Sequence, residues 1–177
     1  ASRTFNIGAG SYINVNANDI EVDATTTNTA GKIVARDGSG NFAAGTITAT
    51  ATQAQYADLA ERYKADADYE AGTLVCIGGE FEITQTENAQ DLGVFGVIST
   101  DPAYLMNAEA DGLPVALAGR VPVKVIGKVA KGDMLVSSNV PGYAMVDNDP
   151  KLGTMIGKAI EDKVDDGKGV VEVLVGK

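Results

Sequence analysis

The sequence lacks several residue types on which common active sites depend. Its 177 residues include no histidine and one cysteine, Cys76. Without histidine, the chain cannot form a Ser-His-Asp or Cys-His catalytic arrangement, and it lacks the commonest zinc ligand. One cysteine excludes an intramolecular disulfide and a cysteine-rich metal site. The neighbours Leu74, Val75 and Ile77 are apolar, so we expect Cys76 to be a small core residue rather than a reactive thiol.

Positive charge and long apolar runs are also scarce. Lys and Arg number 14 against 24 Asp and Glu, which gives a net charge of −10. Nucleic-acid phosphates and anionic membrane surfaces repel such a chain, and no cluster of Lys or Arg offsets the repulsion. No apolar run approaches the roughly 18 residues of a membrane-spanning helix, and we expect no secretion signal. The composition therefore disfavours an enzyme, a nucleic-acid-binding protein and a membrane protein.

Residues 1–50 are predicted to form a strand-rich assembly arm. Short alternating segments at 12–15, 19–23 and 32–36 are typical of strands, and Asp37-Gly38 after them is a hairpin signal. Large apolar residues are too few here to form a separate core. The arm must therefore lie against the following domain, against other copies of the chain or within a larger assembly.

Residues 51–64 change in character, because they contain no glycine or proline. Tyr56, Leu59, Ala60 and Tyr63 follow the spacing i, i+3, i+4, i+7 of one helical face. This spacing predicts a connecting helix, and an extended linker is the alternative.

Asp58 and Glu61 lie three positions apart in this segment. On a helix they would share a face, where two close carboxylates can hold one proton between them and act in acid–base chemistry. The alternative is a solvated helix start, where acidic residues interact favourably with the helix dipole. Composition alone favours the solvated start.

Residues 65–177 are predicted to form a β-domain, since turn residues divide short apolar runs about every 8–12 residues. The domain carries an internal repeat, at about 69–127 and 129–177. Gly72 matches Gly132 and Gly96 matches Gly157, and we expect these glycines at structural turns or close backbone contacts. The predicted fold is thus mainly β: a strand-rich arm, a short connecting helix, and a β-sandwich or barrel of two repeats.

Other candidate sites are weak. Asp147-Asn148-Asp149 and Asp165-Asp166-Gly167 contain ligand types for hard cations, but each lacks the remaining positions of a calcium loop and is typical of a turn. Lys131 and Lys168 each precede a glycine, but the sequence contains no phosphate-binding loop motif. We therefore expect no metal site and no cofactor.

Several segments resemble structural proteins of tailed phages. Residues 36–49, from Arg36-Asp37-Gly38 to Ala49, resemble a repeat of structural and tail-fibre proteins, those of cyanophages especially. Three further segments resemble a C-terminal domain of such proteins, the intramolecular chaperone of phage appendages that is called the peptidase G2 type. These segments are 58–107, 115–125 and 131–136, and the resemblance as a whole covers about residues 32–177.

The resemblance implies a homotrimer. In some relatives it also implies self-cleavage just before an Asp-x-x-Glu motif, which falls here on Asp58 and Glu61, with Ala57–Asp58 as the scissile bond. Relatives that cut carry serine before the aspartate, whereas this chain has Ala57. We therefore expect no catalytic residue.

Together with the composition, this resemblance implies a non-enzymatic virion structural protein of a tailed phage, assembled in the host cytoplasm. It would be a trimeric fibre or appendage component that acts in assembly or attachment. The expected partners are its own copies and other virion proteins of the tail, baseplate or capsid, with a host surface receptor as a further candidate. A trimeric capsid-decoration protein and an autoprocessing intramolecular chaperone are the alternatives.

Overall fold

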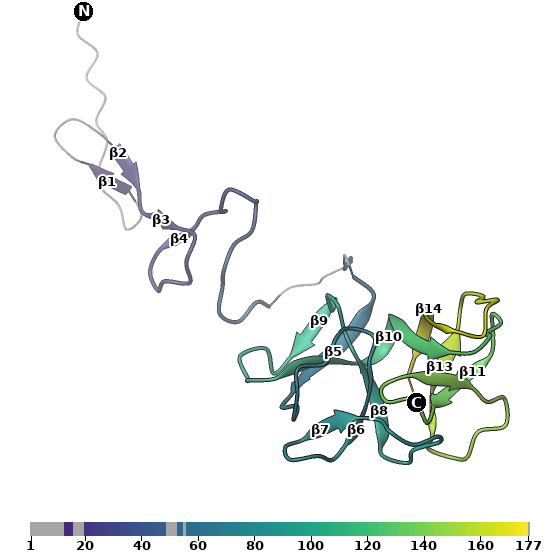
Figure 1. The fold of residues 1–177 in the computed structure, drawn as a ribbon. Coiled ribbons are helices and arrows are strands. Elements are labelled where there is room, and N and C mark those ends of the chain that lie inside the picture. The colour runs from purple at the N-terminus through teal and green to yellow at the C-terminus, as the bar shows by residue number, and fades with distance from the viewer. Residues whose placement is uncertain (1–12, 16–19, 49–52, 55, 177) are drawn as a thin grey trace, which may run out of the picture. The chain divides into compact units, whose positions relative to one another are not determined.

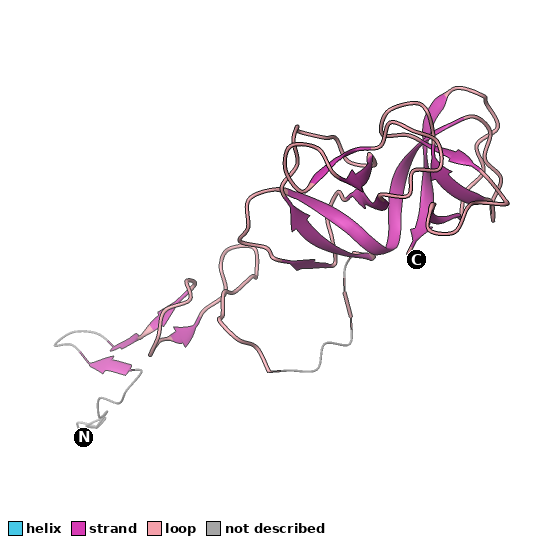
Figure 2. Cartoon of the chain, turned by 90° about the horizontal axis from the view of Figure 1, so that it is seen from below, coloured by secondary structure: helices cyan, strands magenta, loops and turns pink. Residues whose placement is uncertain are grey.

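A computed structural model of the chain describes residues 13–15, 20–48, 53–54 and 56–176 (Figure 1). The chain divides into two units, unit 1 (Ala1–Thr52) and unit 2 (Gln53–Lys177). Figure 2 shows strands joined by loops, and the described residues include no helix. None of these residues therefore belongs to a helix that could cross a membrane. The prediction of a mainly β fold is confirmed.

The described part of unit 1 contains two short strand pairs. Strands β1 (Ile13–Val15) and β2 (Ile20–Val22) pair antiparallel, and β3 (Ala24–Thr25) and β4 (Ile33–Val34) pair parallel. A tight turn follows at Asp37, whose Oδ1 accepts hydrogen bonds from the backbone amides of Ser39 and Asn41. These amides lower the pKa of Asp37, because they stabilise the charged carboxylate.

The prediction of a connecting helix over 51–64 is wrong, because Asp58–Tyr63 form strand β5. β5 pairs antiparallel with β10 (Leu113–Ile126) and parallel with β9 (Tyr104–Met106). These partners lie more than 40 residues away in the sequence, so the local spacing gave no sign of them. β5 pairs with β10 along its length and with β9 at Leu59–Glu61, and this pairing overrides the local helical spacing.

β5 belongs to the ten-stranded sheet that makes up unit 2. Three strands follow β5 before β9, and four follow β10. They are β6 (Leu74–Ile77), β7 (Ile83–Gln85), β8 (Val94–Ile98), β11 (Met134–Ser137), β12 (Ala144–Val146), β13 (Met155–Ala159) and β14 (Lys168–Val175). The long strand β10 joins the two halves of this sheet, since its first half pairs with β5 and β8 and its second half with β14.

The pairings close the sheet into two rings that share β10. The first ring contains β5, β6, β7, β8 and the first half of β10, and a parallel bridge from Ala65 to Ile83 closes it. The second ring contains the second half of β10 with β11, β12, β13 and β14, and the parallel pair Val125–Ala144 closes it. Unit 2 is thus barrel-like on both sides of one common strand.

The same turn precedes β6 in the first ring and β11 in the second. Gly72 donates its amide proton to the carbonyl of Ile98 at 2.8 Å, and Gly132 donates to Ala159 at 2.8 Å. Both glycines have positive φ, +84° and +96°, which side chains disfavour. The two rings therefore repeat one local structure, sixty positions apart in the sequence.

Gly96 and Gly157 lie inside strands β8 and β13 rather than at turns. A Cβ atom on Gly96 would lie 2.9 Å from the carbonyl oxygen of Ala116. A Cβ atom on Gly157 would overlap the carbonyl oxygen of Leu174. Each strand thus passes a neighbouring backbone too closely for a side chain.

The apolar core follows the two rings. The larger cluster lies mainly in the second ring and includes Val121, Val123 and Val173, and the smaller one lies in the first ring around Val115 and Ile83. Cys76 is buried, and burial raises the pKa of its thiol to about 11. At neutral pH this thiol is therefore protonated and poorly reactive.

Candidate functional site

The strongest candidate site lies where the chain enters β5, at the Ala57–Asp58 peptide. Asp58 pairs with Gly119, and the residue is only 6% exposed. The hydroxyl of Ser99 donates a hydrogen bond to Oδ2 of Asp58 at 2.7 Å, and the amide of Ala103 donates to the Asp58 carbonyl at 2.8 Å. The start of β5 is therefore held through both its side chain and its backbone.

Gly119 forms the other side of this site. Its φ is +112°, and a Cβ atom there would overlap the carbonyl oxygen of Ala57 and lie 2.7 Å from Cα of Asp58. The next amide, that of Arg120, donates to the Ala57 carbonyl at 3.1 Å. Glycine at position 119 thus lets β10 approach the Ala57–Asp58 peptide directly.

Glu61 faces away from Asp58, because side chains three positions apart on a strand lie on opposite faces. The two α-carbons are about 10 Å apart at the rise of an extended strand. The helical face expected to carry both carboxylates is therefore absent. Glu61 instead accepts a hydrogen bond from the hydroxyl of Tyr63 at 2.9 Å.

Tyr63 connects Glu61 to the aromatic part of the first ring. Its ring meets that of Phe95 edge to face, with 5.1 Å between centroids. Burial raises the pKa of Tyr63, and the hydrogen bond to the Glu61 carboxylate raises it further. Glu61 therefore has a structural partner on its own face of β5.

The arrangement around Asp58 provides some of the groups that peptide cleavage needs. Cleavage requires a nucleophile, an acid for the leaving nitrogen and donors to the carbonyl oxygen. The site offers the Ser99 hydroxyl beside the Asp58 carboxylate, and one amide donor on the Ala57 carbonyl. Ser99 and Gly119 were not singled out from the sequence, since no local spacing links them to Asp58.

The second ring provides an internal reference for this site. The strand pairings allow the first ring to be aligned with the second. In this alignment Asp58, Glu61 and Ser99 of the first ring correspond to Ala118, Val121 and Ile160 of the second, which are all apolar. The connection from β8 to β10 also contains the extra strand β9, whereas the connection from β13 to β14 contains no strand. The polar groups around Asp58 are therefore an addition to the framework that the two rings share.

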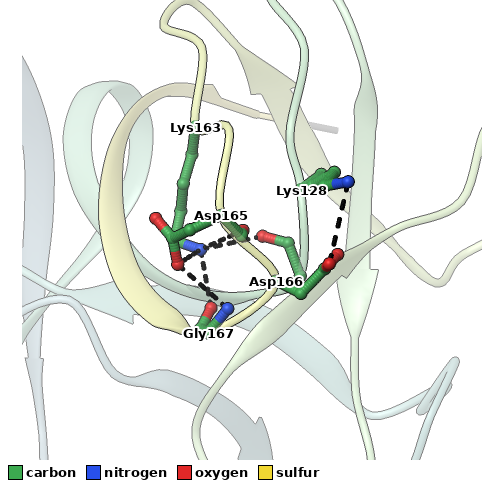
Figure 3. Close-up of polar contacts among 6 residues, drawn as sticks. Lys128, Lys163, Asp165, Asp166 and Gly167 are labelled. Atoms are coloured by element: carbon green, nitrogen blue, oxygen red, sulfur yellow. Dashed lines mark hydrogen bonds and ion pairs between the residues drawn. The ribbon is translucent and has the colours of Figure 1, made fainter.

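The Asp165-Asp166-Gly167 loop surrounds a lysine (Figure 3). Nζ of Lys163 donates to the carbonyl oxygens of Gly127 at 3.0 Å, Asp165 at 2.7 Å and Gly167 at 2.6 Å, and to Oδ1 of Asp165 at 2.8 Å. This ammonium lowers the pKa of Asp165. Asp166 forms a longer ion pair with Lys128, at 3.7 Å. The oxygens that could face a cation are thus directed at the chain's own lysine.

The Asp147-Asn148-Asp149 segment forms a turn. Asp147 accepts hydrogen bonds from the side chain of Gln90 at 2.7 Å and from the amide of Asp149 at 2.9 Å. Asn148 accepts from the amide of Met134 and donates to Asp133, both at 2.9 Å. Across the part of the chain that the structure describes, no three His, Cys, Asp or Glu side chains gather as metal ligands would.

Comparison with solved structures finds a related fold. The chain is similar to the crystal structure of the pre-mature bacteriophage phi29 gene product 12, with a TM-score of 0.55 and 16% sequence identity. The similarity covers 77% of this chain and 23% of that chain, so the two share a fold over about a quarter of the longer protein. Compared with known protein families and with curated proteins, the sequence matches none.

Proposed function

We propose that the protein is a non-enzymatic structural component of a phage particle, a homotrimer of the fibre or appendage type. Two independent lines support this proposal. Segments of both units resemble tail-fibre and appendage proteins of tailed phages, and the fold is shared with a phage protein at 16% identity. Under this proposal unit 1 holds the copies together, and the protein acts with other virion proteins in assembly or attachment.

The observation that carries the proposal is the exposure of unit 1. Between residues 21 and 48 no side chain is buried, although strands pair there. Among the residues of unit 1 that the structure describes, six large apolar ones are exposed: Ile13, Val22, Ile33, Val34, Phe42 and Ile47. Two-stranded sheets are marginally stable alone, and their open edges favour pairing with further strands. A closed symmetric assembly of copies would cover these residues and edges together.

Sedimentation of the full chain tests this proposal. For a trimer, sedimentation equilibrium should give a mass of about three times the chain mass of 18.2 kDa. Ile33→Asp places a charge on the exposed apolar surface of unit 1 and should shift the assembly toward monomer. Val164→Asp is the matched control, because Val164 is also exposed but lies in unit 2. A monomeric wild-type chain at micromolar concentration would contradict the proposal.

Self-cleavage at Ala57–Asp58 is the second candidate function. The contact that favours it is the buried hydrogen bond from Ser99 to Asp58 beside that peptide. In this candidate the chain would be an autoprocessing chaperone, in which cleavage separates residues 1–57, including all of unit 1, from residues 58–177.

A further inference from the structure

An exposed face crosses five strands of unit 2. Strand register places Leu59 opposite both Tyr104 and Ala118, and it places Leu174 opposite both Arg120 and Lys158. Cross-strand partners project from the same side of a sheet. Ala118 and Arg120 flank Gly119 and are both exposed, so they connect the two rows. We call these six residues the cross-strand face.

The cross-strand face carries large apolar groups that no described residue of unit 2 covers. Tyr104 is 65% exposed, Leu174 is 57% exposed and Leu59 is 37% exposed. Tyrosine and arginine are enriched among residues that dominate the binding energy of protein interfaces. Apolar anchors with arginine beside them are typical of a protein contact rather than of a solvated surface.

The charge of this face is opposite to that of the chain. Its six residues include Arg120 and Lys158 but no acidic residue, and Glu61 on β5 and Glu172 on β14 border it. In the described part of the chain, neither cation takes part in an ion pair. The whole chain has a net charge of −10. Copies of the chain therefore repel each other unless a cationic surface of one meets an acidic surface of the next.

We infer that the cross-strand face binds an acidic surface of a second copy of the chain. The inference rests on the proposed function, and it names a surface that the trimer uses. A cationic face that meets an acidic one makes a head-to-tail contact, and head-to-tail contacts between identical chains close into a ring when the rotation allows. The chain also enters β5 at Asp58, next to Leu59, so copies tethered through unit 1 hold this face at a high effective concentration.

Cysteine labelling of the full chain tests this face directly. The single native cysteine is buried and has a pKa of about 11, so it contributes little background. In the assembled protein, we expect a maleimide to label Leu174→Cys at least about tenfold more slowly than Leu152→Cys, because the second copy covers position 174. Leu152 is the matched control, since it is 97% exposed and lies outside the face.

Charge reversal gives a second measurement on the same face. Arg120→Glu in the Leu174→Cys background, or 1 M salt, should raise the labelling rate toward that of Leu152→Cys, because each weakens the charge attraction. Lys131→Glu is the control, since Lys131 is exposed and lies outside the face. Circular dichroism of each variant checks the fold.

The outcomes separate this inference from the proposed function. If the chain sediments as a trimer but the labelling rates at positions 174 and 152 agree within about threefold, the inference about the cross-strand face is wrong and the proposed trimer stands. A wild-type chain that sediments as a monomer overturns both. The inference is supported if position 174 is protected from labelling, and if Arg120→Glu removes this protection while Lys131→Glu leaves it intact.

Discussion

The hydroxyl of Ser99 satisfies a carboxylate that has almost no contact with water. Replacing Ser99 with alanine leaves the buried Asp58 side chain without this donor. We expect Ser99→Ala to lower the free energy of unfolding by about 1–3 kcal/mol, as when a buried polar group loses its partner. Thr100→Ala, at the exposed next position, should change it by less than about 0.5 kcal/mol. Urea titration measures both, and equal effects would show that the hydrogen bond contributes little.

The Ala57–Asp58 bond is expected to remain intact. Residue 57 carries no hydroxyl, and Glu61 faces the opposite side of β5 from Asp58. Mass spectrometry after days at neutral pH should therefore show the full 18.2 kDa chain. Asp58→Asn and Glu61→Gln should alter stability or assembly yield rather than chain length. A fragment that begins at Asp58 and disappears in Ser99→Ala would instead support the autoprocessing candidate.

Residue types allowed some local features of the fold to be predicted from the sequence. Gly72 and Gly132 were found because a tight turn with positive φ favours glycine, and the same short pattern occurs twice. Asp58 was singled out only as part of the Asp-x-x-Glu motif. Its partner Ser99 lies 41 positions away, and their contact depends on how β5 and β8 join β10. No periodicity within either segment carries that information.

At the scale of elements, the pairing of β13 with β14 depends on the close backbone contact at Gly157. A methyl group there would overlap the carbonyl oxygen of Leu174, so β13 and β14 would have to separate. We expect Gly157→Ala to destabilise the protein by about 1–3 kcal/mol, the usual effect of overpacking. Gly38→Ala is the control, because a Cβ there has no neighbour within 4 Å. Thermal unfolding compares the two, and equal melting temperatures would argue against close packing.

The loop between β13 and β14 depends on Lys163. Its side chain is 8% exposed and donates to four oxygens (Figure 3). Lys163→Met keeps the length of the side chain but removes the donors, so we expect a loss of about 1–3 kcal/mol in the free energy of unfolding. Lys128→Met, at an exposed ion pair, should cost at most about 1 kcal/mol. If urea titration ranks them in the opposite order, the buried ammonium is not the anchor of this loop.

Local periodicity failed at β5 for a physical reason. Tyr56, Leu59 and Tyr63 fit a helical spacing, but β5 pairs along its length with β10 and at Leu59–Glu61 with β9, and this long-range pairing outweighs the local spacing. The turns of the two rings were predictable because glycine and aspartate act locally. The sharing of β10 was not, because one continuous 14-residue strand gives no sign that its halves have different partners.

At the scale of the whole molecule, acid should weaken the fold. Neighbouring donors stabilise the charged form and lower the pKa of four carboxyl groups of unit 2: Asp66, Glu70, Asp133 and Asp165. A lowered pKa in the folded state gives stability that is complete above the unfolded value, near pH 4, and lost as the pH falls through the folded value. The melting temperature at about 0.15 M salt should therefore drop below about pH 4. A rise between pH 5 and 3 would contradict this assignment.

Gly119 has one further consequence for unit 2. It pairs with Asp58 on one side and with Val175 on the other, so the first and last strands of the unit end beside the same residue. At the usual strand spacing these two ends lie about 10 Å apart. A body with adjacent ends can be inserted into a surface loop of another protein, or joined end to end and reopened at a different turn, without disturbing its strand order. In engineering terms, unit 2 is a candidate cassette for domain insertion and circular permutation.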